Sequence, residues 1–132
     1  MKCVQPANWS RPKGYANGVV ASGRSVFVSG MIGTDAHGKM VSGDFVQQAR
    51  QTLKNIVEVL FEAGAEPAHI VRMNWYVVDK REYVGAYEEL GIVYREIIGR
   101  HYPAMTAVQV TSLIEDTARL EIEVTAVIPE SQ

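Results

Sequence analysis

Apolar residues recur along the chain at two alternating spacings, and the changes of spacing predict where strands and helices begin. Two short apolar runs, 19–21 and 26–29, are separated by Ser22-Gly23-Arg24, which predicts a hairpin with a tight connection. Residues 35–39 read Asp-Ala-His-Gly-Lys, a pattern typical of a second turn. We therefore expect two or three strands in this part of the chain.

After residue 44 the apolar spacing becomes helical. Asp44 stands where its carboxylate can cap a helix N-terminus, and Gly64 stands where the helix must end in a left-handed backbone. A second helical stretch ends at Gly99 and contains Gly85 and Gly91, each of which weakens it by roughly 1 kcal/mol relative to alanine. The residues at helical spacing are Phe45, Ala49, Leu53, Ile56, Val57, Leu60 and Phe61 in the first helix, and Tyr83, Ala86, Tyr87, Leu90, Val93, Tyr94 and Ile97 in the second.

A spacing of two marks three later strands. The alternation that begins at His69 places on one face Val71, Met73, Trp75 and Val77. Two further strands are expected at about 104–110 and 119–128. In the last strand Glu121 and Glu123 point to one side, and the opposite side is filled by Leu120, Ile122, Val124, Ala126 and Ile128.

The expected element order is ββ(β)αβαββ, in a single domain over residues 1–132 without repeats or a linker. Strand–helix–strand connections are right-handed, so we expect an α+β fold with a mixed sheet and both helices on one face. The other face of the last strand includes Thr125 and Val127. Apolar side chains on a face without helices suggest burial against another subunit.

Composition and charge narrow the functional classes. The formal net charge is −2 and no basic block occurs, which argues against a nucleic-acid groove. Cys3 is the only cysteine, so a disulfide framework is excluded and the reduced cytoplasm is the expected location. No stretch reaches the roughly 18 apolar residues of a membrane span, and residues 1–9 lack the apolar core of a signal peptide. The three histidines have no spacing typical of a metal site, so we expect neither a metal nor another cofactor.

Two C-terminal segments carry a resemblance to a known family. The run His101-Tyr102-Pro103-Ala104-Met105-Thr106-Ala107-Val108-Gln109-Val110, followed by Leu120-Glu121-Ile122-Glu123-Val124-Thr125-Ala126-Val127, resembles the C-terminal half of the RidA (YjgF/YER057c/UK114) family. The resemblance extends to Gly14-Tyr15, to residues 28–33 and to residues 48–56. It implies a chorismate-mutase-like fold assembled as a homotrimer. In that assembly three sheets form a central barrel, the helices lie outside, and clefts lie between neighbouring subunits.

The resemblance also implies roles for residues in such a cleft. Tyr15 matches the aromatic residue that lines it, and Ser29 and Gly30 match the strand-end pair beside it. Glu121 matches the glutamate proposed to position or activate a water, which makes it the candidate catalytic residue. The residues alone leave other interpretations open, because Tyr15 could simply pack and Glu121 could be solvated or paired with Arg119.

The remaining cleft positions are Ala104, Met105, Thr106 and Ala107, and two of them depart from the family. Met105 replaces the arginine that holds the substrate carboxylate in imine-hydrolysing members, and Ala107 stands where several members have a cysteine. Gly91 is the nearest counterpart of an asparagine on the second helix. Losing one partner of a buried charge pair costs about 2–5 kcal/mol, and a thioether is at best a weak acceptor. If Met105 does not merely pack in the core, it favours an apolar or aromatic ligand.

Two functions are compatible with these residues. The first is an enamine/imine deaminase that converts a C=N group to a carbonyl and ammonia, with Glu121 orienting the water and a substrate preference altered at Met105. The second is a non-catalytic trimer that binds a small molecule in the inter-subunit cleft or serves as an interaction module. A ribonuclease gains little support from a net-acidic chain. The discriminating feature is another arginine that could reach the cleft, for which we considered Arg24, Arg50, Arg72 and Arg119.

Overall fold

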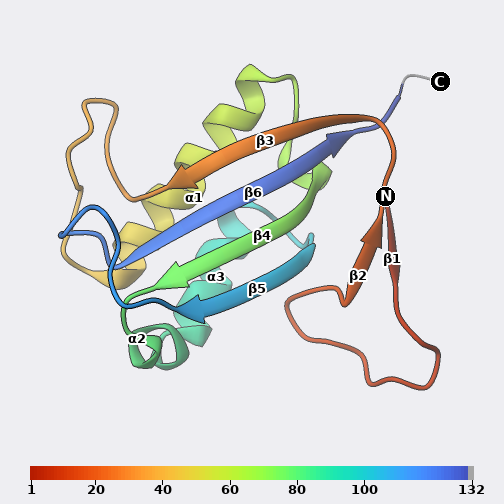
Figure 1. Ribbon diagram of the computed structural model, residues 1–132, viewed down its shortest axis with the longest axis horizontal. Helices are drawn as coiled ribbons and strands as arrows, with labels where there is room; N and C mark the ends of the chain where they lie inside the picture. Colours follow the sequence, from red (N-terminus) through yellow and green to blue (C-terminus); the bar gives the residue numbers. More distant parts are fainter. Residues whose placement is uncertain (131–132) are drawn as a thin grey trace.

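A four-stranded mixed sheet forms the centre of the protein, and the computed structural model describes residues 1–130. The strands, in spatial order, are β3 (Arg24–Met31), β6 (Leu120–Ile128), β4 (Ile70–Val77) and β5 (Ala104–Gln109). β6 is antiparallel to both of its neighbours, whereas β4 and β5 are parallel. One face is covered by α1 (Phe45–Glu62) and α3 (Tyr87–Ile97), with the short α2 (Lys80–Gly85) at one end of the sheet (Figure 1). The α+β class and the mixed sheet agree with the prediction.

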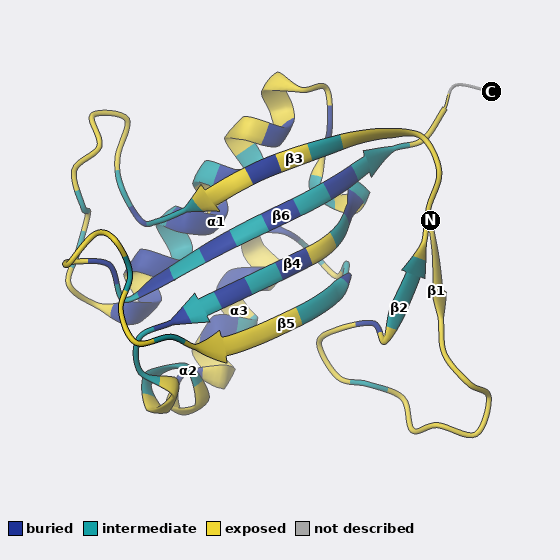
Figure 2. Cartoon of the chain, viewed as in Figure 1, coloured by how far each residue is buried: buried dark blue, intermediate teal, exposed yellow. Residues whose placement is uncertain are grey.

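β6 supplies the centre of the hydrophobic core. Its alternate side chains point towards the helices and are buried, and most of those between them are half-buried on the other face (Figure 2). α1 packs against β6 and β3 and also contacts α3. Full burial of a leucine or isoleucine side chain contributes roughly 1.5–3 kcal/mol, so this layer accounts for much of the stability. The buried residues of β6 are Leu120, Ile122, Val124 and Ala126.

The first helix begins and ends as its sequence predicts. The Asp44 carboxylate accepts a hydrogen bond from the Gln47 backbone N–H at 3.0 Å, which satisfies one of the free donors of the first turn. Gly64 follows the helix with a φ of +80°, a conformation that costs glycine little. The turn at residues 35–39 is also confirmed, because the Asp35 carboxylate accepts from the backbone N–H groups of His37 and Lys39.

The start of β4 differs from its predicted alternation. Ile70 is fully buried and Val71 only half-buried, although the period of two placed Val71 with the core residues. A register shift against β6 lies between Ile70 and Arg72. Such an irregularity changes which side chains face the core, so the expected face of Val71 was wrong, whereas Met73 and Trp75 are buried as predicted.

The second helical stretch is divided into two helices. α2 ends and α3 begins at Ala86, whose backbone has a φ of −109° and a ψ of 12°. Asp79 caps α2 by accepting from the Arg81 N–H at 2.9 Å, but no side chain caps α3. The prediction of one continuous helix was therefore wrong. The break directly follows Gly85, whose weak helix propensity the sequence had indicated.

The predicted N-terminal hairpin was also wrong. β2 (Gly18–Val20) pairs with β1 (Lys2–Val4), a strand that was not predicted, while β3 pairs with β6. The segment Ser22-Gly23-Arg24 instead connects two sheets that lie apart (Figure 1). Gly23 has a φ of +143°, and a Cβ there would overlap the backbone carbonyl of Ile128. The glycine thus permits a close crossing of two segments rather than a tight hairpin turn.

The face of the sheet opposite the helices is more polar than expected. Arg72, Asn74 and Thr125 share this open face, and Phe27 of β3 is 78% exposed on it. Both edge strands, β3 and β5, have one side without a partner strand in residues 1–130. Exposed sheet edges are templates for pairing with another chain, so the edges favour association more than the open face does.

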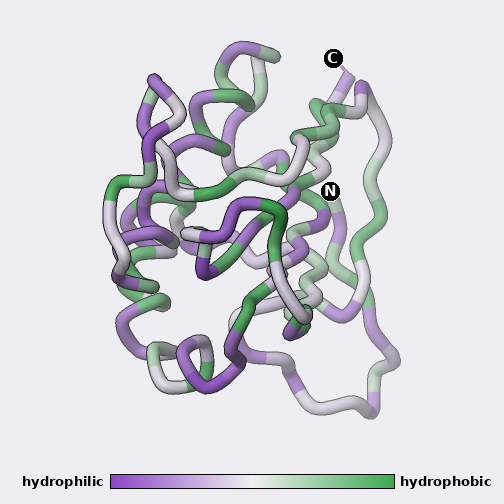
Figure 3. Tube along the Cα trace, turned by 60° about the vertical axis from the view of Figure 1, so that its left-hand side comes forward, coloured by the Kyte–Doolittle hydropathy of each residue, from purple (hydrophilic) through white to green (hydrophobic). Residues whose placement is uncertain are grey.

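Hydropathy changes over short stretches of the chain. Figure 3 shows hydrophobic and hydrophilic residues alternating along the trace. In α1, the helix of 18 residues, Lys54 and Glu58 are exposed on the side away from the core. No helix within residues 1–130 is long and apolar enough to cross a membrane.

A buried glutamine joins the first helix to the start of the central strand. The Gln48 side chain is fully buried, and its Nε2 donates to the carbonyl oxygens of Ser42 at 2.9 Å and Thr117 at 3.0 Å. Its Oε1 accepts from the Arg119 backbone N–H at 2.7 Å. One amide therefore satisfies three backbone groups in the loops before α1 and before β6.

Replacing this amide should destabilise the protein strongly. Gln48→Leu preserves much of the volume but leaves up to three backbone groups without a partner, each costing about 1–3 kcal/mol if it stays buried. We expect a loss of at least about 3 kcal/mol in the free energy of unfolding, measured by urea denaturation. Gln47→Leu is the matched control, because Gln47 is exposed and its substitution should change stability by less than about 0.5 kcal/mol. Equal effects of the two variants would contradict the proposed role of Gln48.

Candidate functional site

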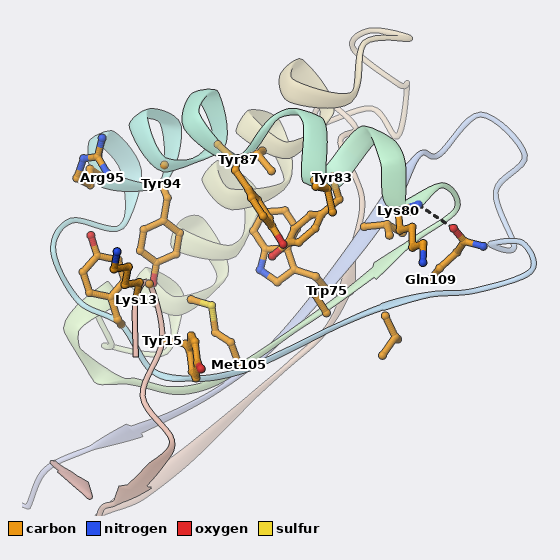
Figure 4. Close-up of a pocket in the computed structure, with 18 residues that line it drawn as sticks. Lys13, Tyr15, Trp75, Lys80, Tyr83, Tyr87, Tyr94, Arg95, Met105 and Gln109 are labelled. Carbon is orange, nitrogen blue, oxygen red and sulfur yellow. Dashed lines mark hydrogen bonds between the residues drawn. The ribbon is translucent and has the colours of Figure 1, made fainter. Parts of the chain in front are cut away.

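A cavity of about 880 Å³ lies between β5 and the helices α2 and α3. Met105 and Ala107 of β5 line it beside Trp75 of β4 (Figure 4), because Met105 pairs in register with Met73 and Ala107 with Trp75. Residues paired in register share a face of the sheet, so the cavity opens on the face that the helices cover. Tyr15, which is 43% exposed, closes it from the N-terminal segment.

Aromatic side chains form much of the cavity wall. The rings of Trp75 and Tyr83 lie 5.6 Å apart at 59°, and those of Tyr83 and Tyr87 lie 5.3 Å apart at 82°. Tyr94 and Tyr102 stack at 5.5 Å with nearly parallel planes. Tilted, edge-to-face and stacked arrangements are all favourable for aromatic pairs. The five rings also leave part of their surface facing the cavity (Figure 4).

Two tyrosines in this wall, Tyr83 and Tyr94, have a raised pKa. Burial raises the pKa of Tyr83, and the nearby Tyr87 phenol adds to the shift. Burial likewise raises the pKa of Tyr94, whose hydroxyl donates to the His101 carbonyl oxygen at 2.5 Å. These residues therefore offer apolar ring surface and neutral hydroxyl groups to a ligand.

Trp75 contributes an unusual polar group to the same wall. The residue is 4% exposed, and its buried Nε1–H has no hydrogen-bond partner within residues 1–130. A buried donor without an acceptor costs about 1–3 kcal/mol, so an acceptor from a ligand or a water molecule at this wall would be favourable.

The charged residues that line the cavity are all cationic. They are Lys13, Lys80 and Arg95, and no aspartate or glutamate lines it among the described residues. None of the three takes part in the ion pairs found in residues 1–130, which are Arg50–Glu96, Arg81–Asp79 and Arg119–Glu82. The cavity therefore combines an aromatic surface with unpaired positive charge.

None of the four arginines considered from the sequence lines this cavity. Arg50 pairs with Glu96 at 2.8 Å, and Arg119 pairs with Glu82 at 2.5 Å rather than with Glu121. Arg72 lies on the open face. Sequence reasoning missed Arg95, because the stripe of its helix was assigned from the apolar residues alone.

The other predicted site residues lie on the opposite face of the sheet. Ala104 and Thr106 are in register with Arg72 and Asn74, which places both on the open face. Ser29 lines a shallow depression there, of about 400 Å³. Within one chain the sheet thus separates these residues from Tyr15, Met105 and Ala107.

Gly30 and Glu121 are held against one another. An irregularity between Val28 and Met31 interrupts the pairing of β3 with β6 and places Gly30 directly beside the Glu121 side chain. A Cβ at residue 30 would overlap the Glu121 carboxylate. A side chain at residue 30 would therefore require the Glu121 carboxylate to move, and glycine allows the close approach.

The neighbouring carboxylate, Glu123, is held by hydrogen bonds. The Tyr76 hydroxyl and Asn74 Nδ2 both donate to Glu123 Oε1. The bond from Tyr76, followed by that from Asn74, lowers the pKa of Glu123, and the same bond to Glu123 raises the pKa of Tyr76. The Glu123 carboxylate thus accepts hydrogen bonds from its own chain. The Glu121 carboxylate accepts none from another side chain within residues 1–130.

Comparison with known proteins identifies the family. A family model described as endoribonuclease L-PSP matches residues 9–128. The human 2-iminobutanoate/2-iminopropanoate deaminase is 31% identical over 114 residues, which are 86% of this chain and 79% of that protein. A RutC family protein of Pyrococcus horikoshii is 32% identical over 120 residues, 90% of this chain and 91% of the relative. The chain therefore belongs to the RidA (YjgF/YER057c/UK114) family, as its sequence predicted.

Solved structures show the same fold. A Rid family protein from Yersinia pestis superposes with a TM-score of 0.82 at 30% identity, over 96% of this chain and 98% of that one. A YjgF/YER057c/UK114 family member from Mycobacterium tuberculosis gives a TM-score of 0.65 at 32% identity, over 88% of each chain. The arrangement of sheet and helices is therefore that of the family.

The lowered pKa of Glu123 predicts a pH dependence of stability. A carboxylate whose pKa is lowered on folding stabilises the protein above its unfolded value of about 4.5, and this contribution is lost as the pH falls through the folded value. Wild-type protein should therefore lose more stability on acidification than Tyr76→Phe or Glu123→Gln, which lack the bond. Urea midpoints measured from neutral pH to below the ordinary carboxyl pKa test this. Identical pH dependence in all three proteins would refute it.

Proposed function

We propose that the protein hydrolyses reactive imines or enamines, and that Met105 alters its substrate preference. The observation that carries the proposal is the position of Met105 in a cavity whose charged lining residues are all cationic. Relatives named 2-iminobutanoate/2-iminopropanoate deaminase support the reaction class. Tyr15 and Ala107 line the same cavity, which supports the cleft that the family resemblance implies.

The reaction needs only water and proton transfer. Water adds to the C=N carbon, a new C–O bond forms, and the C–N bond then breaks to leave a carbonyl compound and ammonia. In the proposal Glu121 accepts a proton from the attacking water and returns it to the departing nitrogen. Holding the reactants in place accounts for most of the acceleration, so loss of one anchoring arginine can change the substrate without abolishing the reaction.

The proposal requires a second copy of the chain. Glu121 and Met105 lie on opposite faces of one sheet, so Glu121 must come from a neighbouring subunit to reach the cavity. The unpartnered edges of β3 and β5 support this association, and the family resemblance implies a homotrimer with its clefts between subunits. Ser29, Gly30, Ala104 and Thr106 would then lie near the subunit boundary.

The alternative is a trimer that binds a small molecule without converting it. The observation in its favour is that Met105 and Ala107 bring no ionisable or strongly polar group to the cavity. The placement of the Glu121 carboxylate directly beside Gly30, without a side-chain hydrogen bond to another described residue, favours hydrolysis instead.

The assembly can be tested by mass. Light scattering coupled to size exclusion should give about three times the chain mass of 14.6 kDa at micromolar concentration. Phe27→Asp, which adds charge to an exposed residue of edge strand β3, should shift the protein towards the monomer. A stable wild-type monomer under these conditions would remove the shared site on which the proposal depends.

The role of residue 105 can be tested by restoring the family arginine. We expect weak turnover of 2-iminopropanoate and 2-iminobutanoate by the wild type, with the imines generated in situ by an amino-acid oxidase or a threonine dehydratase. Met105→Arg should raise this turnover by at least about tenfold, because a guanidinium binds a carboxylate through two charge-assisted hydrogen bonds. Ammonia and 2-oxo acid release provide the readout.

Two further variants make this test specific. Met105→Arg combined with Glu121→Ala should stay inactive, because the added anchor still lacks the group that activates water. Met105→Leu should show no gain, since leucine changes shape without adding charge. A folded, trimeric Met105→Arg protein that hydrolyses neither imine would favour the binding protein over the enzyme.

A further inference from the structure

We infer that the cavity binds aromatic carboxylates, with Arg95 of α3 holding the carboxylate and the aromatic wall holding the ring. The inference rests on the proposed function in one respect: if the protein is a hydrolase, its substrates are 2-imino acids with a bulky aromatic side chain. The binding of the aromatic anion itself does not depend on hydrolysis.

The Arg95 guanidinium lies beside a glycine one turn earlier in α3. A Cβ at Gly91 would lie 3.2 Å from Arg95 Nη1, closer than an ordinary van der Waals contact. A Cβ at residue 91 would therefore require the guanidinium to shift by a few tenths of an ångström. Gly91 and Met105 both line the cavity with Arg95. We infer that Arg95 of α3 is the cation that anchors a carboxylate in this cavity.

The Arg95 guanidinium is available to a ligand. On its own helix the positions three and four residues away are Gly91, Ile92, Ile98 and Gly99, none of which is acidic. The adjacent Glu96 is engaged with Arg50 of α1. Arg95 is exposed in the single chain and forms no ion pair within residues 1–130. The guanidinium can therefore donate two parallel hydrogen bonds to a carboxylate.

Both ends of the cavity carry a cation, and the aromatic rings lie nearer to one of them. In Figure 4 Arg95 and Lys13 lie at one end and Lys80 at the other, with Met105 between them. The rings of Trp75, Tyr83 and Tyr87 lie towards the Lys80 end. A carboxylate at Arg95 would thus place an attached aromatic side chain past Met105, towards these rings.

The aromatic wall suits a ring better than an alkyl chain. The tilted and edge-to-face pairs around Tyr83 can extend to a ligand ring in the same geometry, and the Met105 thioether makes favourable contacts with ring edges. The Trp75 N–H still lacks an acceptor in this wall. A three-carbon imino acid held at Arg95 would leave most of the cavity of about 880 Å³ unfilled.

Hydrolysis of two imines tests the substrate class. An L-amino-acid oxidase generates 2-imino-3-phenylpropanoate from phenylalanine and 2-iminopropanoate from alanine. With water, each imine yields the corresponding 2-oxo acid and ammonia, with no redox change in the step assigned to this protein. We expect kcat/KM for the phenyl compound to exceed that for 2-iminopropanoate by at least about tenfold, since ring burial adds apolar contact.

Arginine variants test the anchor. Arg95→Gln should lower kcat/KM for the phenyl imine by about tenfold or more, mainly by raising KM, because a charged hydrogen-bond partner is lost. The kcat/KM of Arg95→Lys should lie between those of the wild type and Arg95→Gln. Lysine retains the positive charge but cannot donate two parallel hydrogen bonds from one planar group. Arg81→Gln is the matched control, since Arg81 is an exposed arginine on α2 that does not line the cavity, and it should behave as wild type.

Gly91→Ala separates anchoring from stability. Alanine is the better helix former, so this variant should melt at a higher temperature than wild type. The added methyl group would shift the Arg95 guanidinium by a few tenths of an ångström, so we expect KM for the phenyl imine nevertheless to rise. A merely structural role for Gly91 and Arg95 would not produce greater stability together with weaker binding.

A binding measurement keeps the two proposals distinguishable. The probe is 3-phenylpropanoate, which cannot be hydrolysed, and its binding is followed by Trp75 fluorescence in a Trp9→Phe background. It should bind the wild type, bind Arg95→Gln at least about tenfold more weakly, and bind far better than propanoate. Binding with this pattern but no hydrolysis of either imine would overturn the proposed function and support the ligand class.

Other outcomes overturn the inference itself. Equal turnover of both imines, or wild-type behaviour of Arg95→Gln, would show that Arg95 and the aromatic wall do not select the substrate, while the hydrolase proposal stands. Failure to bind 3-phenylpropanoate and to hydrolyse either imine would remove both proposals.

Discussion

The architecture depends on one buried amide, that of Gln48, which ties the loop before α1 to the loop before β6. β6 is the central strand, and it carries core residues on one face and Glu121 and Glu123 on the other. Because Gln48 Oε1 accepts from the backbone at Arg119, it fixes the point at which β6 begins against the helix layer. The position of both carboxylates along the sheet follows from that point.

The cavity arises where a helix layer and an edge strand meet. β5 is the last strand of the sheet, so Met105 and Ala107 have a neighbouring strand on one side only, and both line the cavity with residues of α3. Tyrosines from the helices close one side without filling the space. Arg95 of α3 and Met105 of β5 therefore line the same cavity.

The sequence predicted the parts of the fold that local spacing determines. The strong helical period and the Asp44 cap identified α1, and the period of two identified β4 and β6. The pairing of β3 with β6 and the break at Ala86 depend on contacts between distant segments, which local spacing does not contain. Local spacing also could not predict the register shift at the start of β4, which places Ile70 in the core where Val71 was expected.

The candidate site was predictable only in part, for a related physical reason. The family resemblance indicated the cleft-lining positions Tyr15, Met105 and Ala107, which the structure brings together. It could not indicate which side of the sheet each residue faces within one chain. The tyrosine stripe of the second helical stretch was assigned to packing, because a core and a cavity wall require the same helical spacing. Arg95 lies outside that stripe and was overlooked.

The separation of Met105 from Glu121 by the sheet means that an isolated chain holds two half-sites that face away from one another. In the proposed homotrimer, the cavity of each chain would form a site with Glu121 of one neighbour, and its own Glu121 would complete the site of the other neighbour. Activity would then depend on protein concentration, and dilution would abolish it while every chain remained folded. A ligand that bridges two subunits would in turn stabilise the homotrimer, by mass action.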